Sequence, residues 1–221
     1  MVMDNIQYTP KEGNRVVVPL YGQNLVQKMP ELIAQGYKPI SIAQIMEERL
    51  KEAKGLEVAR ENDYHKIWGG DDLYSGDSIL YHPDGRIKVV LDSKKVRNIN
   101  DISSLKNGSI VLPKGTFEKR KGVEFSKKDT KRFTGKSLEL SKILKNEIWL
   151  TLARGDKKLL TEYAGEVSLR STSRMLMNIL VNDAPEFETE SLWSLGHIND
   201  SNVFGGDFWG LSSFRILYGY R

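Results

Sequence analysis

The 221-residue sequence contains no cysteine. This absence excludes disulfides, thiolate-bound metals and cysteine nucleophiles together, and it is typical of proteins in a reducing compartment. No apolar run approaches the roughly 20 residues needed to span a bilayer, and the first residues have neither the basic start nor the apolar core of a secretion signal. We therefore expect an intracellular, cytoplasmic protein with no membrane partner.

Motifs for metal binding by histidines, nucleophilic catalysis and cofactor binding are also absent from the sequence. The three histidines, His65, His82 and His197, lack the close spacing of paired metal ligands. No serine lies in a nucleophile-elbow sequence, and no glycine-rich dinucleotide motif follows a strand pattern. The Gly-Gly-Asp-Asp run at 69–72 lacks the Lys-Ser/Thr of a phosphate-binding loop and predicts a turn. These absences predict no bound cofactor.

The clearest fold signal is a β-hairpin within residues 76–94. Two runs rich in strand-forming residues, 78–82 and 86–92, flank Pro83-Asp84-Gly85, in which proline and glycine suit successive turn positions. The register that this turn implies gives one apolar, buried face, made of Ile79, Tyr81, Ile87, Val89 and Leu91. The other face is mostly polar and predicts a side turned toward water; it contains Ser78, Leu80, His82, Arg86, Lys88, Val90, Asp92 and Lys94.

Helical patterns lie on either side of this hairpin. Apolar residues at helical spacing predict a helix within 24–35, and a capping box of Ser41 and Gln44 predicts another from residue 42 to about 54. From residue 136 to 169 the pattern is again helical. The run 174–181 is apolar all round, so periodicity does not distinguish a helix from a buried strand there.

The C-terminal stretch, 192–221, alternates aromatic residues with glycines. This pattern predicts strands and turns that complete the sheet, with an exposed stacking platform or partner surface as the alternative.

Together these patterns predict an α+β fold. We expect an antiparallel sheet with the hairpin near its middle, packed against helices from the N-terminal third and from residues 136–169. Residues 1–14 are polar and unpatterned and predict a flexible arm. The remainder, 15–221, predicts a single domain, with a subdivision near 114–135 as the alternative.

Positive charge is concentrated between residues 114 and 145. This segment contains eleven Lys or Arg against four Asp or Glu, an excess of seven, whereas the whole chain carries a net charge of +4. A solvated helix and loop would explain such a run. The alternative is a surface that holds phosphates while aromatic side chains stack on bases. Its candidate residues are Lys119, Arg120, Lys121, Lys127, Lys128, Lys131 and Arg132, with Phe117, Phe125 and Phe133 between them.

A second hypothesis concerns the hairpin ends. Asp77 opens the first strand, and Asp92 and Lys94 follow the second in an acid-x-Lys pattern. This arrangement resembles the PD-(D/E)xK signature of restriction-endonuclease-like nucleases. The resemblance implies Mg²⁺ held by Asp77 and Asp92, with Lys94 activating a water molecule. The predicted register argues against it, because it places Asp77 on the face opposite to Asp92 and Lys94.

The sequence therefore leaves two functional classes. The favoured one is a non-catalytic binding protein whose basic segment contacts nucleic acid or another acidic partner. The other is a Mg²⁺-dependent nuclease with Asp77, Asp92 and Lys94 at its active site.

Overall fold

The structure is a computed structural model. It describes residues 18–20, 25–54, 73–100, 105–106, 108–134, 137–138, 140–170, 175–179, 185–196, 203–205 and 216–220. The expected N-terminal arm and the turn at 69–72 lie outside these ranges. No helix of the described residues is long and apolar enough to cross a membrane.

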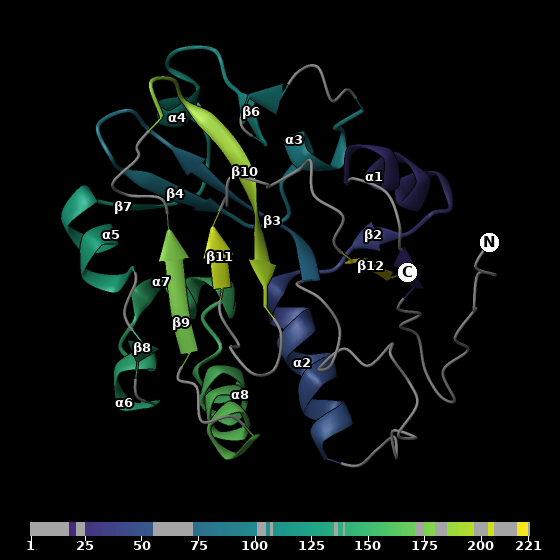
Figure 1. Cartoon of the computed structure of the whole chain (residues 1–221), viewed down its shortest axis with the longest axis vertical. Helices are drawn as coiled ribbons and strands as arrows, with labels where there is room; N and C mark the ends of the chain where they lie inside the picture. Colours follow the sequence, from purple (N-terminus) through teal and green to yellow (C-terminus); the bar gives the residue numbers. More distant parts are fainter. Residues whose placement is uncertain are drawn as a thin grey trace.

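The described elements confirm an α+β fold (Figure 1). The strands are β1 (Val18–Leu20), β2 (Lys38–Pro39), β3 (Leu73–Tyr81), β4 (Ile87–Val90), β5 (Leu105–Lys106), β6 (Ser109–Val111), β7 (Val123–Phe125), β8 (Ser137–Leu138), β9 (Met175–Ile179), β10 (Thr189–Leu195), β11 (Val203–Gly205) and β12 (Ile216–Tyr220). The helices are α1 (Leu25–Ala34), α2 (Ile42–Ala53), α3 (Lys94–Arg97), α4 (Thr116–Lys119), α5 (Lys127–Phe133), α6 (Leu140–Ile143), α7 (Glu147–Leu152) and α8 (Lys157–Arg170).

Strand β3 is the centre of the sheet. It pairs with β10 along one edge, while its other edge pairs with β12 over one half and with β4 over the other. Most strand pairs are antiparallel, and the parallel ones are β3 with β12 and β9 with β11. The hairpin therefore lies near the middle of the sheet, as predicted.

The hairpin register is the one that the turn sequence predicts. Tyr81 lies opposite Ile87, and Ile79 lies opposite Val89. The turn is closed by a hydrogen bond from the His82 backbone N–H to the Arg86 carbonyl. Gly85 adopts φ of 92°, a left-handed conformation in which a side chain would be strained.

Both faces of the sheet are covered, so the predicted side toward water is wrong. The α2–α8 core lies on one face and includes Ile79, Val89, Trp149, Tyr163 and Trp193. The α1–α3 core lies on the other and includes Met29, Leu80, Val90, Phe117 and Leu192. All of β3 and β4 is buried. The hairpin's polar face is thus covered by α1, α3 and the segment around α4.

Several local predictions are confirmed. The Ser41–Gln44 capping box is present at the start of α2. The ambiguous run 174–181 contains a strand, β9, and the C-terminal stretch contains the end of β10 and all of β11 and β12. The helical pattern from residue 136 is wrong at its start, because Ser137–Leu138 forms strand β8, paired with β9.

Candidate functional site

The two acidic residues of the nuclease hypothesis, Asp77 and Asp92, lie next to each other in the structure. The Asp77 Oδ1 atom accepts a hydrogen bond of 3.0 Å from the backbone N–H of Asp92. The expected separation of the two residues is wrong even though the register behind it is right. Strand β4 ends at Val90, and Asp92 then turns the chain with φ of 53°. A left-handed residue past a strand end breaks the alternation on which the expectation rests.

Arginines hold these carboxylates. An Arg154 guanidinium nitrogen (Nη2) lies 2.8 Å from Asp92 Oδ2 and 3.7 Å from Asp77 Oδ1. Arg97 donates to Asp92 Oδ1 at 3.0 Å. A guanidinium thus lies where the hypothesis requires Mg²⁺. Lys94 is exposed and begins α3, away from the strand position that the motif requires. The geometry is that of an ion-pair network, and no group of three or more His, Cys, Asp or Glu in the described ranges is placed to hold a metal ion.

The role of Asp77 in this network is structural. It is fully buried, and its Oδ2 atom accepts a 2.9 Å hydrogen bond from the backbone N–H of Ile42, the first residue of α2. A carboxylate is favourable at a helix N-terminus. Burial, the largest influence, raises the pKa of Asp77 to about 6, against the lowering effect of the N–H groups of Asp92 and Ile42 and of Arg154. Asp77 therefore ties α2 to the end of the hairpin.

The candidate basic segment exposes its cations but buries aromatic side chains. Lys119, Lys121, Lys127, Lys128, Lys131 and Arg132 are exposed, and Arg120 is half-buried. Phe117 is fully buried in the α1–α3 core, and Phe125 is buried in the α2–α8 core. The expectation that Phe125 stacks on a base is therefore wrong, because its ring completes the core beside Ile87. Phe133 ends α5, and its side chain lies outside the described part of the chain.

The segment around α4, residues 113–122, is fixed to the sheet by buried charges, and we name it the α4 loop. Glu188 accepts hydrogen bonds of 2.7 Å from the backbone N–H groups of both Gly115 and Phe117. From the other side, the buried Lys88 ammonium donates to the carbonyls of Phe117 and Arg120 at 2.7 and 3.2 Å. The backbone polar groups of the loop are thus satisfied by side chains from β4 and from the residue before β10.

A third buried carboxylate, Glu190, joins the α4 loop to α3. It is fully buried and accepts hydrogen bonds from the hydroxyls of Ser78 (2.7 Å) and Ser93. Arg120 approaches it at 3.3 Å. Sequence reasoning missed Glu188, Glu190 and Arg154, because each meets partners far away in the sequence and none belongs to a local motif.

Replacing Glu188 with Gln tests the anchoring of the α4 loop. Burial alone would raise the pKa of Glu188, but the N–H groups of Phe117 and Gly115 outweigh it and hold the pKa below its ordinary value. Gln keeps one acceptor and turns an N–H₂ group toward a backbone N–H. We expect a loss of about 2 kcal/mol in the free energy of unfolding, measured by urea denaturation. Glu186→Gln, at an exposed residue two positions away, is the control and should change little. Equal effects of the two changes would contradict the anchoring.

Comparison with known proteins identifies the fold. No family model matches the chain, and no curated protein matches it. The chain is similar to a solved structure described as "Accommodation of massive sequence variation in Nanoarchaeota by the C-type lectin fold", with a TM-score of 0.69 and 12% sequence identity. The similarity covers 94% of this chain and 98% of that chain. At this identity the similarity shows the fold alone, and the α+β architecture described above is that of the C-type lectin fold.

Proposed function

We propose that this chain is a non-catalytic binding protein that contacts an acidic partner through the exposed cations of residues 119–132. The proposal rests on the exposure of four of these lysines and on their lack of ion pairs within the described part of the chain. Lys119, Lys121, Lys128 and Lys131 are exposed, and none of them forms an ion pair with any residue in the described ranges. Unpaired surface cations leave a positive potential that attracts anionic partners.

Two acidic residues near these lysines are directed toward another cation. Glu118 and Glu124 both bind the Arg86 guanidinium, at 2.7 and 2.8 Å. Hydrogen bonds from Arg86, the largest influence, lower the pKa of Glu124. Within the described ranges, neither carboxylate forms an ion pair with Lys119, Lys121, Lys128 or Lys131.

The fold similarity supports a binding role by analogy. The similar structure is described in terms of massive sequence variation accommodated by the C-type lectin fold. A framework that keeps its shape while surface residues vary suits a binding scaffold, since function lies in the surface groups and not in the fold itself. The two covered sheet faces and buried anchors of this chain are a framework of that kind.

A salt titration of polyanion binding tests the proposal. We expect the full chain to bind DNA, RNA or polyglutamate at about 100 mM salt, where the Debye length is about 10 Å, and to lose affinity as salt rises. The variant Lys119→Gln, Lys121→Gln, Lys128→Gln, Lys131→Gln should bind more weakly. The matched control changes four exposed lysines elsewhere to Gln, namely Lys51, Lys54, Lys157 and Lys158, and should bind nearly as well as the wild type.

Incubating the chain and the nucleic acid with Mg²⁺ or EDTA distinguishes binding from catalysis. We expect Mg²⁺ and EDTA to leave the nucleic acid intact and its binding unchanged. Cleavage that requires Mg²⁺ and is lost on Asp92→Ala would restore the nuclease hypothesis. Failure of every polyanion to bind, or equal losses in the two lysine variants, would overturn the proposed contact surface.

A further inference from the structure

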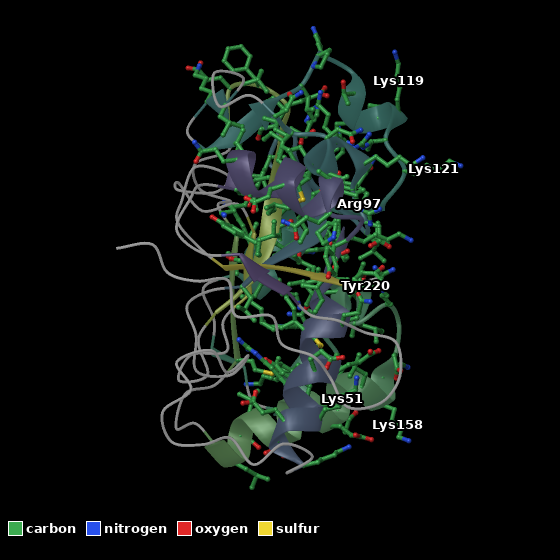
Figure 2. All side chains as sticks on the ribbon, turned by 90° about the vertical axis from the view of Figure 1, so that its right-hand side faces the viewer. Lys51, Arg97, Lys119, Lys121, Lys158 and Tyr220 are labelled. Atoms are coloured by element: carbon green, nitrogen blue, oxygen red, sulfur yellow. The ribbon has the colours of Figure 1, made fainter. Side chains whose placement is uncertain are left out.

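The α4 loop and α3 are in contact, and both carry exposed lysines. Arg120 of the loop lies 3.3 Å from the Ser93 hydroxyl, and Ser93 is the N-cap residue of α3. Figure 2 shows Lys119, Lys121 and Arg97 in the upper half of the side that also carries Lys51 and Lys158 lower down. The exposed lysines of the two elements, which we name the α3–α4 surface, are Lys94, Lys95, Lys119 and Lys121.

The acids near the four lysines bind other cations or are buried, and Glu118, in the α4 loop itself, binds Arg86 at 2.7 Å. Asp92 is held by Arg97 and Arg154, and Glu190 is fully buried beneath Arg120. None of the four lysines forms an ion pair within the described ranges. By contrast, Lys51 and Lys54 at the far end of the molecule pair with Glu48 and Glu162.

The α4 loop is also held rigid from within. Phe117 is fully buried, and Lys88 and Glu188 fix the loop backbone from opposite sides. At Gly122 the chain passes so close to β4 that an added Cβ would lie 2.6 Å from the Val89 carbonyl oxygen. A surface already fixed in place loses little conformational entropy on binding.

The types of side chain on the α3–α4 surface indicate which class of acidic partner would bind there. Among the described residues one large aromatic side chain, Phe187, is exposed, at 45%, and the Lys106 ammonium lies 4.4 Å from the centre of its ring, so a single strand would find no row of free stacking rings. Protein interfaces are depleted of lysine and enriched in aromatic residues at their cores. Val123, directly after the α4 loop, is an exposed apolar residue, at 45%. Phosphates of a duplex backbone need neither stacking nor apolar contact and are bound by lysine without regard to sequence.

We propose that the α3–α4 surface binds the phosphate backbone of double-stranded nucleic acid without sequence preference. This inference rests on the proposed function and makes it specific in two respects. It names the partner class, and it places the main contact on α3 and the α4 loop, with the lysines of α5 contributing less.

The test compares salt slopes for two variants of equal charge. The surface variant changes Lys94, Lys95, Lys119 and Lys121 to Gln; the control variant changes Lys127, Lys128, Lys131 and Arg132, all exposed on α5, to Gln. The probes are a labelled DNA duplex, the matching single strand and polyglutamate. Each phosphate contact contributes about 0.9 to the slope of log K against log salt for a duplex, so the surface variant should lose about 2 to 4 of the slope and the control less than about 1.

Each possible result supports or overturns one part of the inference. Duplex binding that is lost in the surface variant and kept in the control supports the inference. A larger loss in the α5 control overturns the location while the proposed acidic partner stands. Polyglutamate or single strands bound more tightly than the duplex overturn the partner class alone. Failure of all three probes to bind overturns the inference together with the proposed function.

Discussion

Val89→Asp is expected to lower the free energy of unfolding by about 4 kcal/mol or more. Val89 is fully buried in the α2–α8 core, and a carboxylate there would have no partner to compensate for its lost hydration. Val123 lies directly opposite on β7 and is 45% exposed, so it offers a matched control on the neighbouring strand. Val123→Asp should cost less than about 1 kcal/mol, mostly through strand propensity. Urea denaturation of both variants measures the difference, and similar losses would mean that β4 is misplaced in the sheet.

A substitution at Lys88, next to Val89, tests whether the polar face of the hairpin is covered by the α4 loop or exposed to solvent. Its ammonium group donates to two carbonyls of the α4 loop and lies 4.4 Å from the centre of the Phe117 ring. Lys88→Met, which keeps most of the side-chain volume, should cost about 1–3 kcal/mol because both carbonyls lose their donor. A solvated strand face would tolerate the same change, so an unaltered stability would show that the α4 loop does not pack there.

The Asp77 carboxyl is expected to make stability fall as pH rises from about 4 to about 6. Its pKa in the folded protein is raised from 3.8 to about 6. The folded state therefore holds the proton more tightly than the unfolded state, and the stabilisation is present below the unfolded pKa and lost as pH passes the folded one. One pKa unit corresponds to 1.36 kcal/mol, which gives a loss of about 3 kcal/mol.

Asp77→Asn isolates this contribution, because asparagine does not titrate. The stability of the wild type relative to the variant, from urea denaturation between pH 4 and 7, should fall by about 3 kcal/mol. A second variant, Arg154→Gln, removes a cation that lowers the pKa of Asp77, so it should shift the decline to higher pH. A wild-type curve parallel to that of Asp77→Asn would show that this carboxyl keeps its ordinary pKa in the fold.

Local patterns predicted much of the framework. The hairpin register follows from Pro83-Asp84-Gly85, and the start of α2 follows from Ser41 and Gln44, because each signal lies within a few residues of its effect. The α+β class follows from the sum of such signals. Local patterns fail at β8 and the short α6, where the sequence predicts one helix from residue 136. There the pairing of β8 with β9 outweighs a weak helical pattern.

The candidate site was harder to predict because its contacts are distant in sequence. Lys88 looks like a solvated residue in an alternating strand, but its acceptors lie about 30 residues further along the chain. Ser78 reaches Glu190, which is 112 residues away. Polar residues can be buried when hydrogen bonds satisfy them, and alternation alone cannot reveal the partner. The direction of the Asp92 side chain depends on a single left-handed residue, which no periodicity encodes.

The position of β3 also sets the order in which the chain can complete its structure during synthesis. Only β4 among its partners is a close neighbour in sequence, and β10 and β12 are made more than a hundred residues later. Strand β4 can pair with β7 soon afterwards, but the β3 edge that β10 covers keeps bare N–H and C=O groups, which can pair with other chains. Closing the long loops between β3 and its C-terminal partners is slow, so the C-terminal strands complete the sheet last. The chain is most prone to aggregate before these strands are made.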